Sequence, residues 1–348
     1  MVFPLSVIVP NFNDARFLPT ALDALLSQSE PAQEIFVVDD ASRDESPEII
    51  KDYARRYSVI RPVLLDRNVG VVAIMNRFAR EAKTDFIYFG AADDYVLPGY
   101  FDTARHMLEK HPGAGLCSAL CKVVDEPGRD RGVFHSPVPM RRAGFIDQEQ
   151  GRSLLLHDDS WIMGNTAIYR REAILAEGGF NATLHGFSDG FMHRLMILQH
   201  GVCFIPQPYV CLRQRKGSMS DRTNTDPDLL AKVISSTTEL MLRDPKHRFP
   251  PGYAEKWKQR MRFGALRSQL GRSWIKRSYL SVFGLAGIDH AIVVSLLALR
   301  ARKLAESYLF LRLRAFDLWA MIDRRVFRER HFSQAGANRD QLVCNCLL

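Results

Sequence analysis

The first 111 residues alternate short apolar runs with stretches of helical periodicity, and this alternation restricts the fold more than any other feature of the sequence. The apolar runs lie at 5–9, 34–38, 59–65 and 86–89. Between them, apolar residues recur at helical spacing, which predicts helices over 18–26, 46–57, 71–82 and 98–111. Strands that alternate with helices favour a parallel sheet covered on both faces. We therefore predict an α/β fold with a mostly parallel, twisted sheet.

Beyond residue 111 the pattern is less regular. We expect strands at 115–124, 202–205 and 209–212, a strand-like segment at 161–169 with a break at Gly164-Asn165, and helices at 148–156, 171–177 and 191–200. The segment 125–144 is rich in Pro, Gly and Arg, which predicts a surface loop. We place a first domain over 1–224.

The remaining part, 225–348, is expected to be a separate helical region with basic faces. Residues 241–348 hold 21 Lys and Arg against 8 Asp and Glu, a net charge of +13, so the first 240 residues carry −5. Such asymmetry argues against a uniform nucleic-acid binder. It predicts that this region faces an anionic partner such as a membrane surface or a phosphorylated lipid.

One apolar stretch within that region allows three interpretations. Residues 279–299 lack Lys and Arg and are just long enough to span a bilayer. Asp289 and His290 lie at its middle, where a charge costs about 2.5–3.5 kcal/mol. A packed helix pair, an interfacial amphipathic segment and a true span all remain open.

The start of the chain and its cysteines bear on its location. The sequence opens directly on a strand-like run rather than on a basic and then long apolar leader. The six cysteines are scattered and form no paired metal or disulfide pattern, so we expect them to be reduced. We expect a cytoplasmic protein, peripheral at the inner face of the cell membrane.

Polar residues follow three of the predicted strands. They are Asn11-Phe12-Asn13, Asp39-Asp40 and Asp93-Asp94. Because ligands of open α/β sheets bind beyond the carboxyl ends of the strands, we expect these loops to form one site. Carboxylates there suit Mg²⁺ or Mn²⁺ and a diphosphate, whereas Gly-rich phosphate loops are absent from the sequence. Asp93 and Asp94 fit a helix cap equally well.

The motifs 6–13, 34–44, 68–70 and 91–94, in this order and spacing, resemble the family 2 glycosyltransferases with the GT-A fold. The resemblance covers about residues 4–220. It implies an inverting enzyme that moves a sugar from a nucleotide-diphosphate sugar to an acceptor hydroxyl, in the synthesis of cell-surface polysaccharide or glycolipid. The acceptor would be a saccharide or a lipid-linked saccharide.

The resemblance assigns roles to individual residues of the donor site. It implies a nucleotide-binding loop at Pro10, Phe12 and Asn13, a contact of Asp40 with the nucleobase and Asp39 close by, a donor-pocket wall at Asn68, and a divalent metal, Mg²⁺ or Mn²⁺, on Asp93 with Asp94 beside it. Ala91 stands where the family often has a further Asp, which removes one carboxylate from the expected metal site.

Two later segments complete the resemblance. The segment 178–189 is similar to the one that supplies the catalytic base, with Ser188 in place of the common Glu. We favour Asp189 as the base, with His185 as the competitor. In the basic loop 212–220, Arg213 or Lys216 would neutralise the leaving diphosphate. Trp161 would stack on an acceptor sugar or lie in the core.

Two other functions compete with sugar transfer. A nucleotidyltransferase would want a Gly- and Arg-rich loop after the first strand, and residues 10–13 provide neither. A non-catalytic nucleotide-sugar binder of the same fold is the stronger rival, because Ala91 and Ser188 depart from the family at chemically central positions.

Overall fold

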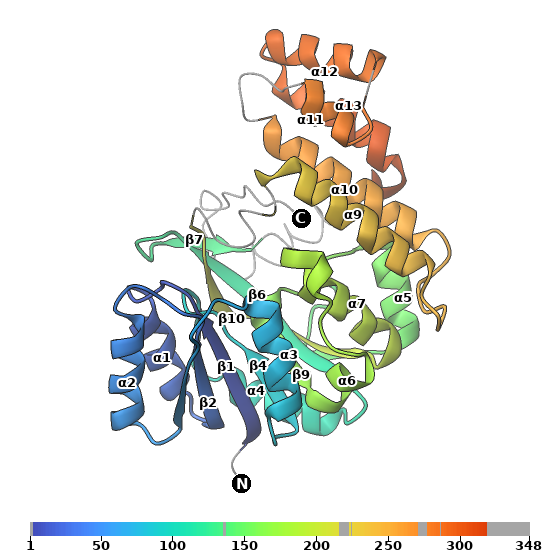
Figure 1. Cartoon of the computed structure of the whole chain (residues 1–348). Coiled ribbons are helices and arrows are strands. Elements are labelled where there is room, and N and C mark those ends of the chain that lie inside the picture. The colour runs from blue at the N-terminus through green and yellow to red at the C-terminus, as the bar shows by residue number, and fades with distance from the viewer. Residues whose placement is uncertain are drawn as a thin grey trace. The chain divides into compact units, whose positions relative to one another are not determined.

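The computed structural model describes residues 3–134, 137–215, 223, 225–270, 277–285 and 287–318 (Figure 1). The chain divides into two compact units. The sheet unit comprises Met1–Gly151, Trp161–Ala182 and Ser188–Arg215, and the helical unit comprises Arg152–Ser160, Thr183–Phe187 and Lys216–Leu348. Two short internal segments thus group with the C-terminal helices, and the predicted domain boundary after residue 224 remains a prediction.

Ten strands of the described chain form one sheet in the order β3-β2-β1-β4-β9-β6-β10-β5, with β7 and β8 paired to β6 and β10. The strands are β1 (Phe3–Asn11), β2 (Ala32–Asp39), β3 (Ile60–Leu64), β4 (Phe86–Phe89), β5 (Tyr95–Val96), β6 (Leu116–Val124), β7 (Asp130–Val133), β8 (Gly144–Ile146), β9 (Ile168–Arg170) and β10 (Val202–Arg213). The first four pair in parallel, as do β6 and β10. β9 lies antiparallel between β4 and β6.

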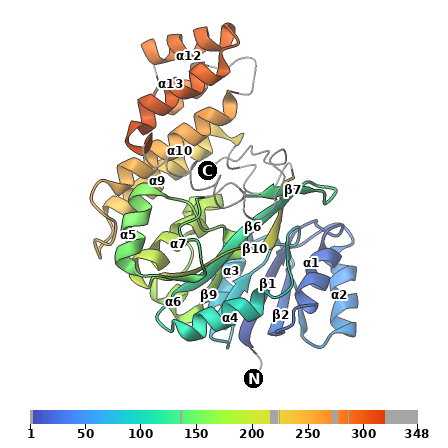
Figure 2. The same ribbon diagram turned by 180° about the vertical axis from the view of Figure 1, so that it is seen from behind.

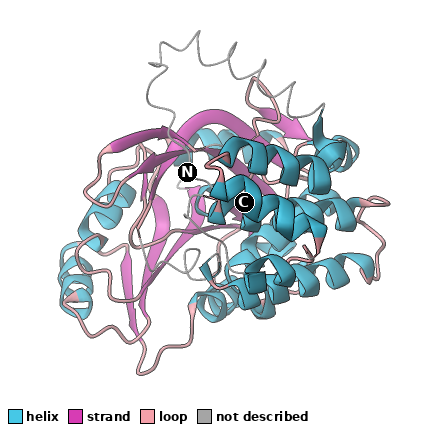
Figure 3. Ribbon diagram, turned by 90° about the horizontal axis from the view of Figure 1, so that it is seen from above, coloured by secondary structure: helices cyan, strands magenta, loops and turns pink. Residues whose placement is uncertain are grey.

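Helices alternate with the first strands along the chain, and Figure 3 shows helices and strands in separate colours. Those with most of their residues in the sheet unit are α1 (Leu18–Leu26), α2 (Ser46–Arg56), α3 (Val71–Glu81), α4 (Tyr100–Lys110), α6 (Arg171–Ala176) and α7 (Ser188–Gln199), with the short helix η1 (Gly164–Thr166). α5 (Gln148–His157) begins in the sheet unit and ends in the helical unit.

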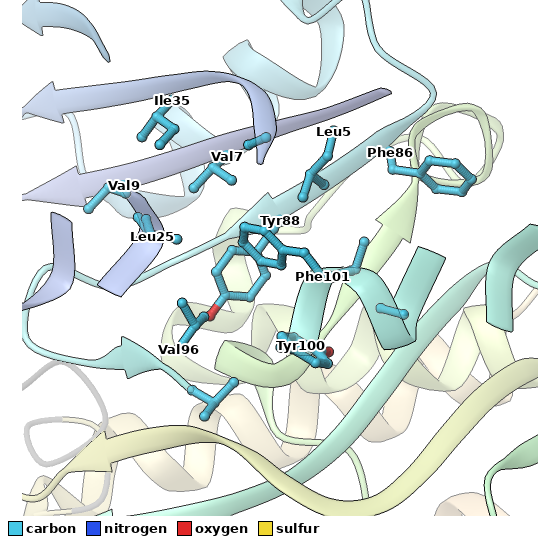
Figure 4. Packing of buried hydrophobic residues seen from close by; sticks show 14 of the residues in the cluster. Leu5, Val7, Val9, Leu25, Ile35, Phe86, Tyr88, Val96, Tyr100 and Phe101 are labelled. Atoms are coloured by element: carbon cyan, nitrogen blue, oxygen red, sulfur yellow. The ribbon is translucent and has the colours of Figure 1, made fainter. Parts of the chain in front are cut away.

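Alternate residues of β1 and β2 point to opposite faces of the sheet, and each face has its own helices. Leu5, Val7 and Val9 share one buried cluster with side chains of α1, α2 and α4 (Figure 4). Phe36 points the other way and packs on Phe78 of α3, with ring centroids 4.9 Å apart. α3 and α4 accordingly lie on opposite faces, as the front and back views show (Figures 1 and 2).

The sheet core fixes the positions of the loops that follow β1, β2 and β4. Tyr88 of β4 packs edge-on against Tyr100 and Phe101 of α4, and its hydroxyl donates to the carbonyl of Asn165 at 2.7 Å. Burying an aromatic side chain of this size stabilises the fold by about 1.5–3 kcal/mol. The rim beyond β4 is therefore held by a rigid aromatic cluster.

The predicted α/β class, with a largely parallel sheet and further C-terminal helices, is confirmed, and so are the first four strands and helices. The two predicted strands at 202–205 and 209–212 are one strand, β10. Pro206 and Pro208 suggest a break, but shifts of register around Pro208 absorb them within the strand. β7 forms within the stretch 125–144 that was predicted as a loop.

In the helical unit, α9 (Pro227–Leu242), α10 (Tyr253–Gln269), α11 (Arg277–Val282), α12 (Ile288–Ala298) and α13 (Arg302–Arg314) follow one another, with η2 (Ala182–Phe187) and η3 (Ala315–Asp317) as short helices. The apolar stretch 279–299 is broken between α11 and α12. Asp289 accepts a hydrogen bond from Tyr308 and pairs with Arg312 at 3.1 Å, which ties α12 to α13. The stretch therefore forms two helices, of which α12 packs on α13, and a contact of this stretch with a membrane surface remains a prediction. Among the residues described, no helix combines the length and the apolar character that a bilayer crossing requires.

Candidate active site

The loops after β1 and β2 are joined by their own polar side chains at one edge of the sheet, toward which the arrows of both strands point (Figure 1). Asn11 Nδ2 donates to Asp39 Oδ1 at 2.8 Å. The backbone N–H of Asn13 donates to Ser42 Oγ at 2.8 Å, and Asn13 Oδ1 accepts from the backbone N–H of Arg43 at 2.8 Å. Asp39 and Asn13 therefore hold these two loops together.

Phe12 is free to meet a ligand at this edge, because its ring is 43% exposed although it is apolar. Pro10, near the end of β1, is half-buried. A flat, exposed aromatic ring on a fixed loop can stack on a nucleobase. Phe12 thus remains suited to the nucleotide-binding role that the resemblance implies.

Asp40 is occupied by the turn that begins α3. Its two carboxylate oxygens accept the backbone N–H groups of Val69 at 2.7 Å and Gly70 at 2.9 Å, and Asn68 Nδ2 donates to its carbonyl oxygen at 3.3 Å. Gly70 has φ of +85°, a value that favours glycine. Asp40 and Asn68 thus fasten the start of α3, and a contact of either with a nucleobase or donor remains a prediction.

Asp93 and Asp14 bind the same arginine, Arg215, whose role the sequence did not reveal. Arg215 Nε donates to Asp93 Oδ2, and its Nη2 donates to Asp14 Oδ2 at 2.8 Å. The three side chains are 23% exposed for Arg215, 10% for Asp14 and 15% for Asp93. Burial raises the pKa of Asp14 to about 6, against the opposing pull of Arg215. The guanidinium therefore lies between two carboxylates from separate loops.

Asp94 is buried beside Asp93, and both of its carboxylate oxygens accept hydrogen bonds. Its Oδ1 accepts the backbone N–H of Arg213 at 2.8 Å, and its Oδ2 accepts Asn165 Nδ2 at 2.7 Å. Burial, followed by the charge of Asp93, raises the pKa of Asp94 to about 7. Asp94 consequently joins β10 and η1 to the rim.

The predicted contact of Arg213 with a diphosphate needs correction. Its side chain is 8% exposed and donates to the backbone carbonyls of Asp93, Asp125 and Glu126, while its guanidinium lies 4.8 Å from the ring centroid of Phe17. Because β10 stays paired to β6 as far as residue 213, this side chain is enclosed by the neighbouring loops. Arg215, two residues on, is the more exposed of these two arginines, with its side chain 23% exposed. Lys216 lies outside the described residues.

Asp189, the favoured base, lies in the first turn of α7 and against η1. A β-carbon on Gly164 would overlap its Oδ2, and its Oδ1 accepts the backbone N–H of Gly190 at 2.6 Å. Burial raises the pKa of Asp189 above its usual 3.8 although Gly190 and Arg194 act in the opposite sense. A carboxylate with a raised pKa is a stronger proton acceptor.

The two remaining predicted residues have different surroundings. His185 is exposed, has φ of +48° and belongs to the helical unit. Trp161 is 1% exposed and packs edge-on against Phe204. The prediction that Trp161 stacks on an acceptor sugar is therefore wrong, and its alternative, a core position, is observed.

The described carboxylates do not make a conventional divalent site. No group of three His, Cys, Asp or Glu side chains in the described chain could hold a metal ion. Mg²⁺ and Mn²⁺ prefer about six oxygen ligands, but Asp94 is engaged by two donors and Ala91 adds no oxygen. The residues present fit such an ion poorly.

Comparison with known proteins indicates a glycosyltransferase. The family model described as glycosyl transferase family 2 matches residues 6–176. An uncharacterized glycosyltransferase of Escherichia coli is 31% identical over 190 residues, 52% of this chain and 53% of that protein. An uncharacterized protein of Mycobacterium bovis is 29% identical over 171 residues, 48% of this chain and 47% of that protein. The chain thus spans about half the length of these curated relatives.

Solved structures share the fold at low sequence identity. TarS of S. aureus in complex with UDP-GlcNAc aligns with a TM-score of 0.58 and 17% identity over 90% of this chain and 91% of that one. The mannosyltransferase PcManGT from Pyrobaculum calidifontis, in complex with GDP-Man and Mn²⁺, aligns with a TM-score of 0.55 and 18% identity over 92% of this chain and 88% of that one. The fold is of the GT-A type, and residues 6–176 form a domain of glycosyl transferase family 2.

Proposed function

We propose that this chain transfers a sugar from a nucleotide-diphosphate sugar to an acceptor hydroxyl with inversion at the anomeric carbon. The observation that supports it best is the turn η1, which contacts a carboxylate on each side. Asn165 binds Asp94 at the donor edge, and Gly164 lies against Asp189. A donor over the first carboxylate and an acceptor at the second would meet across this turn.

The donor would bind along the edge formed by the loops after β1, β2 and β4. Its nucleobase would stack on Phe12, and the rigid links among Asn11, Asn13 and Asp39 would fix the loops that receive it. Structural neighbours in complex with UDP-GlcNAc and GDP-Man support a nucleotide-sugar donor. The divalent ion that the resemblance places on Asp93 is not part of this proposal, because Asp93 already pairs with Arg215.

Asp189 would accept the proton of the acceptor hydroxyl while the oxygen attacks the anomeric carbon. The attack comes from the face opposite the leaving nucleoside diphosphate, so one C–O bond forms as the other breaks. Burial raises the pKa of Asp189 and so makes it a better base than an exposed aspartate. Positioned acid–base groups of this kind accelerate reactions by about 10²–10⁴-fold.

The Asp189→Asn variant tests this function against a non-catalytic binder. Transfer should fall by about 10²–10⁴-fold in the variant, while its affinity for the matching nucleoside diphosphate, measured by calorimetry, should stay within about threefold of wild type. If wild type binds the nucleotide sugar but neither hydrolyses nor transfers it to any acceptor in a panel of saccharides and lipid-linked saccharides, the chain is a binder.

The acceptor side of the proposal includes a membrane surface. The turn after α12 and the start of α13 expose Leu299 at 76% and Leu304 at 61%, and Arg300, Arg302 and Lys303 between them are exposed as well. Apolar side chains next to unburied cations favour the interface of an anionic bilayer. This would bring a cytoplasmic enzyme to a lipid-linked acceptor at the inner face of the membrane.

Vesicle sedimentation tests the membrane contact. Wild type should sediment with phosphatidylglycerol vesicles and not with phosphatidylcholine vesicles, and a Leu299→Glu, Leu304→Glu variant should lose this binding. Leu242→Glu is the matched control, because Leu242 is 71% exposed and the adjacent Arg243 already pairs with Glu239. Equal sedimentation of all three proteins would contradict the proposed contact.

A further inference from the structure

At the edge of the sheet where the donor would bind, the positive charge comes from a side chain of the protein, Arg215. Arg215 lies two residues beyond the end of β10 and reaches Asp93, after β4, and Asp14, after β1. Asp93 is the residue on which the resemblance places a metal. The guanidinium thus already engages the carboxylate oxygen that a divalent ion would need.

A metal ion would have to displace this guanidinium to bind as expected. Divalent cations and guanidinium groups repel each other at short range. The neighbouring positions add no free oxygen ligand, because the side chain of Ala91 has no ligand atom and the carboxylate of Asp94 accepts hydrogen bonds from Arg213 and Asn165. The side chains present therefore offer the expected metal ion too few free oxygen ligands.

Arg215 also has donors left for a ligand. Nε and Nη2 are engaged, and its Nη1 makes no hydrogen bond within the part of the chain that the structure describes. The guanidinium groups of both arginines lie near the ring of Phe17, but the Arg215 side chain is 23% exposed, whereas Arg213 is 8% exposed and its guanidinium donates to three backbone carbonyls. A planar guanidinium matches phosphate oxygens in pairs, and the two carboxylates hold it in place.

We propose that Arg215 takes the place of the divalent metal in this chain and meets the diphosphate of the donor. The proposal rests on the proposed function, because it assumes a nucleoside-diphosphate leaving group. Asp93 and Asp14 then act as positioning residues for the guanidinium. A fixed positive charge where the diphosphate departs stabilises the charge that develops there.

Binding of UDP and GDP, measured by calorimetry in EDTA and in Mn²⁺, tests the proposal. Wild type should bind one of them equally well in both buffers. Arg215→Ala should bind about 10- to 100-fold more weakly in EDTA and recover affinity in Mn²⁺, because Asp93 and Asp14 are then free to hold the ion. Mn²⁺ alone, followed by electron paramagnetic resonance, should bind to Arg215→Ala and not to wild type.

Two further variants keep the test interpretable. Arg215→Lys retains the charge if the alanine variant unfolds, and it should bind in EDTA with intermediate affinity. Arg55→Ala is the matched control, since it removes an exposed guanidinium–carboxylate pair with Asp52 on α2. It should bind as wild type does.

The outcomes separate this proposal from the function on which it rests. Wild-type binding that requires Mn²⁺, together with Mn²⁺ binding that is the same in wild type and Arg215→Ala, overturns the role of Arg215 and leaves sugar transfer standing. If neither diphosphate nor any of a panel of other nucleoside diphosphates binds wild type in either buffer, the proposed function fails and the role of Arg215 fails with it.

Discussion

Gly164 and Asp189 are in such close contact that a β-carbon at position 164 would overlap the Oδ2 oxygen of the aspartate. The next residue, Asn165, donates to Asp94 Oδ2 at 2.7 Å. A single turn of η1 therefore sets the positions of the candidate base and of a carboxylate at the donor edge. Small changes in this turn should affect the reaction more than the fold.

Gly164→Ala should displace Asp189 and slow transfer by about 100-fold, because a misplacement of about 1 Å can cost that much. Nucleoside diphosphate affinity should change little, since Asp94 keeps its partner. Steady-state rates and calorimetric affinities check both statements. Gly113→Ala is the control, because a β-carbon at Gly113 meets nothing within 4 Å. An unchanged rate in Gly164→Ala would show that the position of Asp189 does not matter.

The rate of transfer should rise with pH as Asp189 loses its proton, and level off above its pKa. Burial raises that pKa above 3.8, so the acidic limb should lie at higher pH than for an exposed aspartate. His185→Gln should keep the same limb, and Asp189→Asn should lose it. A limb that disappears in His185→Gln instead would assign the base to the histidine.

The sheet could be predicted from the sequence because each of its first four strands is an apolar run closed by a polar turn. Asp39, Asp40 and Asp93 could be placed at one edge for the same reason, since parallel strands end on the same side. The hydrogen-bond partners of these side chains could not be predicted. That Asp40 binds the turn before α3 depends on where residues 69 and 70 pack, which no local pattern reports.

The basic loop 212–220 is a second case in which the sequence could not predict the partners of its side chains. Arg213, Arg215 and Lys216 lie within four positions, and any of them could face a diphosphate. Whether Arg213 or Arg215 is available for such a contact depends on the pairing of β10 with β6, which encloses Arg213 and leaves Arg215 able to reach the carboxylates. Trp161 is similar, because the same ring suits a sugar or a core, and packing on Phe204 decides it.

Asp40→Asn should destabilise the fold. An amide nitrogen would face one of the two backbone N–H groups that the carboxylate now accepts, so the free energy of unfolding should fall by about 1–3 kcal/mol. Denaturant titration measures it, and Asp66→Asn, at an exposed position, is the control. Unchanged stability with lost nucleotide affinity would contradict the structural role and favour the nucleobase contact.

Asp14 should make the fold less stable as pH rises between about 4 and 6. Its pKa is raised from 3.8 to about 6, by burial first and by Asp93 and Asp44 to a smaller extent, while Arg215 lowers it. In this window the folded state binds more protons than the unfolded state, so raising the pH favours unfolding. Above pH 6 and below pH 4 the contribution of Asp14 should be constant.

Thermal melts of wild type and Asp14→Asn across this pH range test that sign. Because the other titrating groups are common to both proteins, their effects should largely cancel in the difference between the two curves. That difference should change in favour of the variant as pH rises from about 4 to 6, and then stay level. A difference that moves in favour of wild type would mean that Arg215 lowers the pKa of Asp14 more than burial raises it.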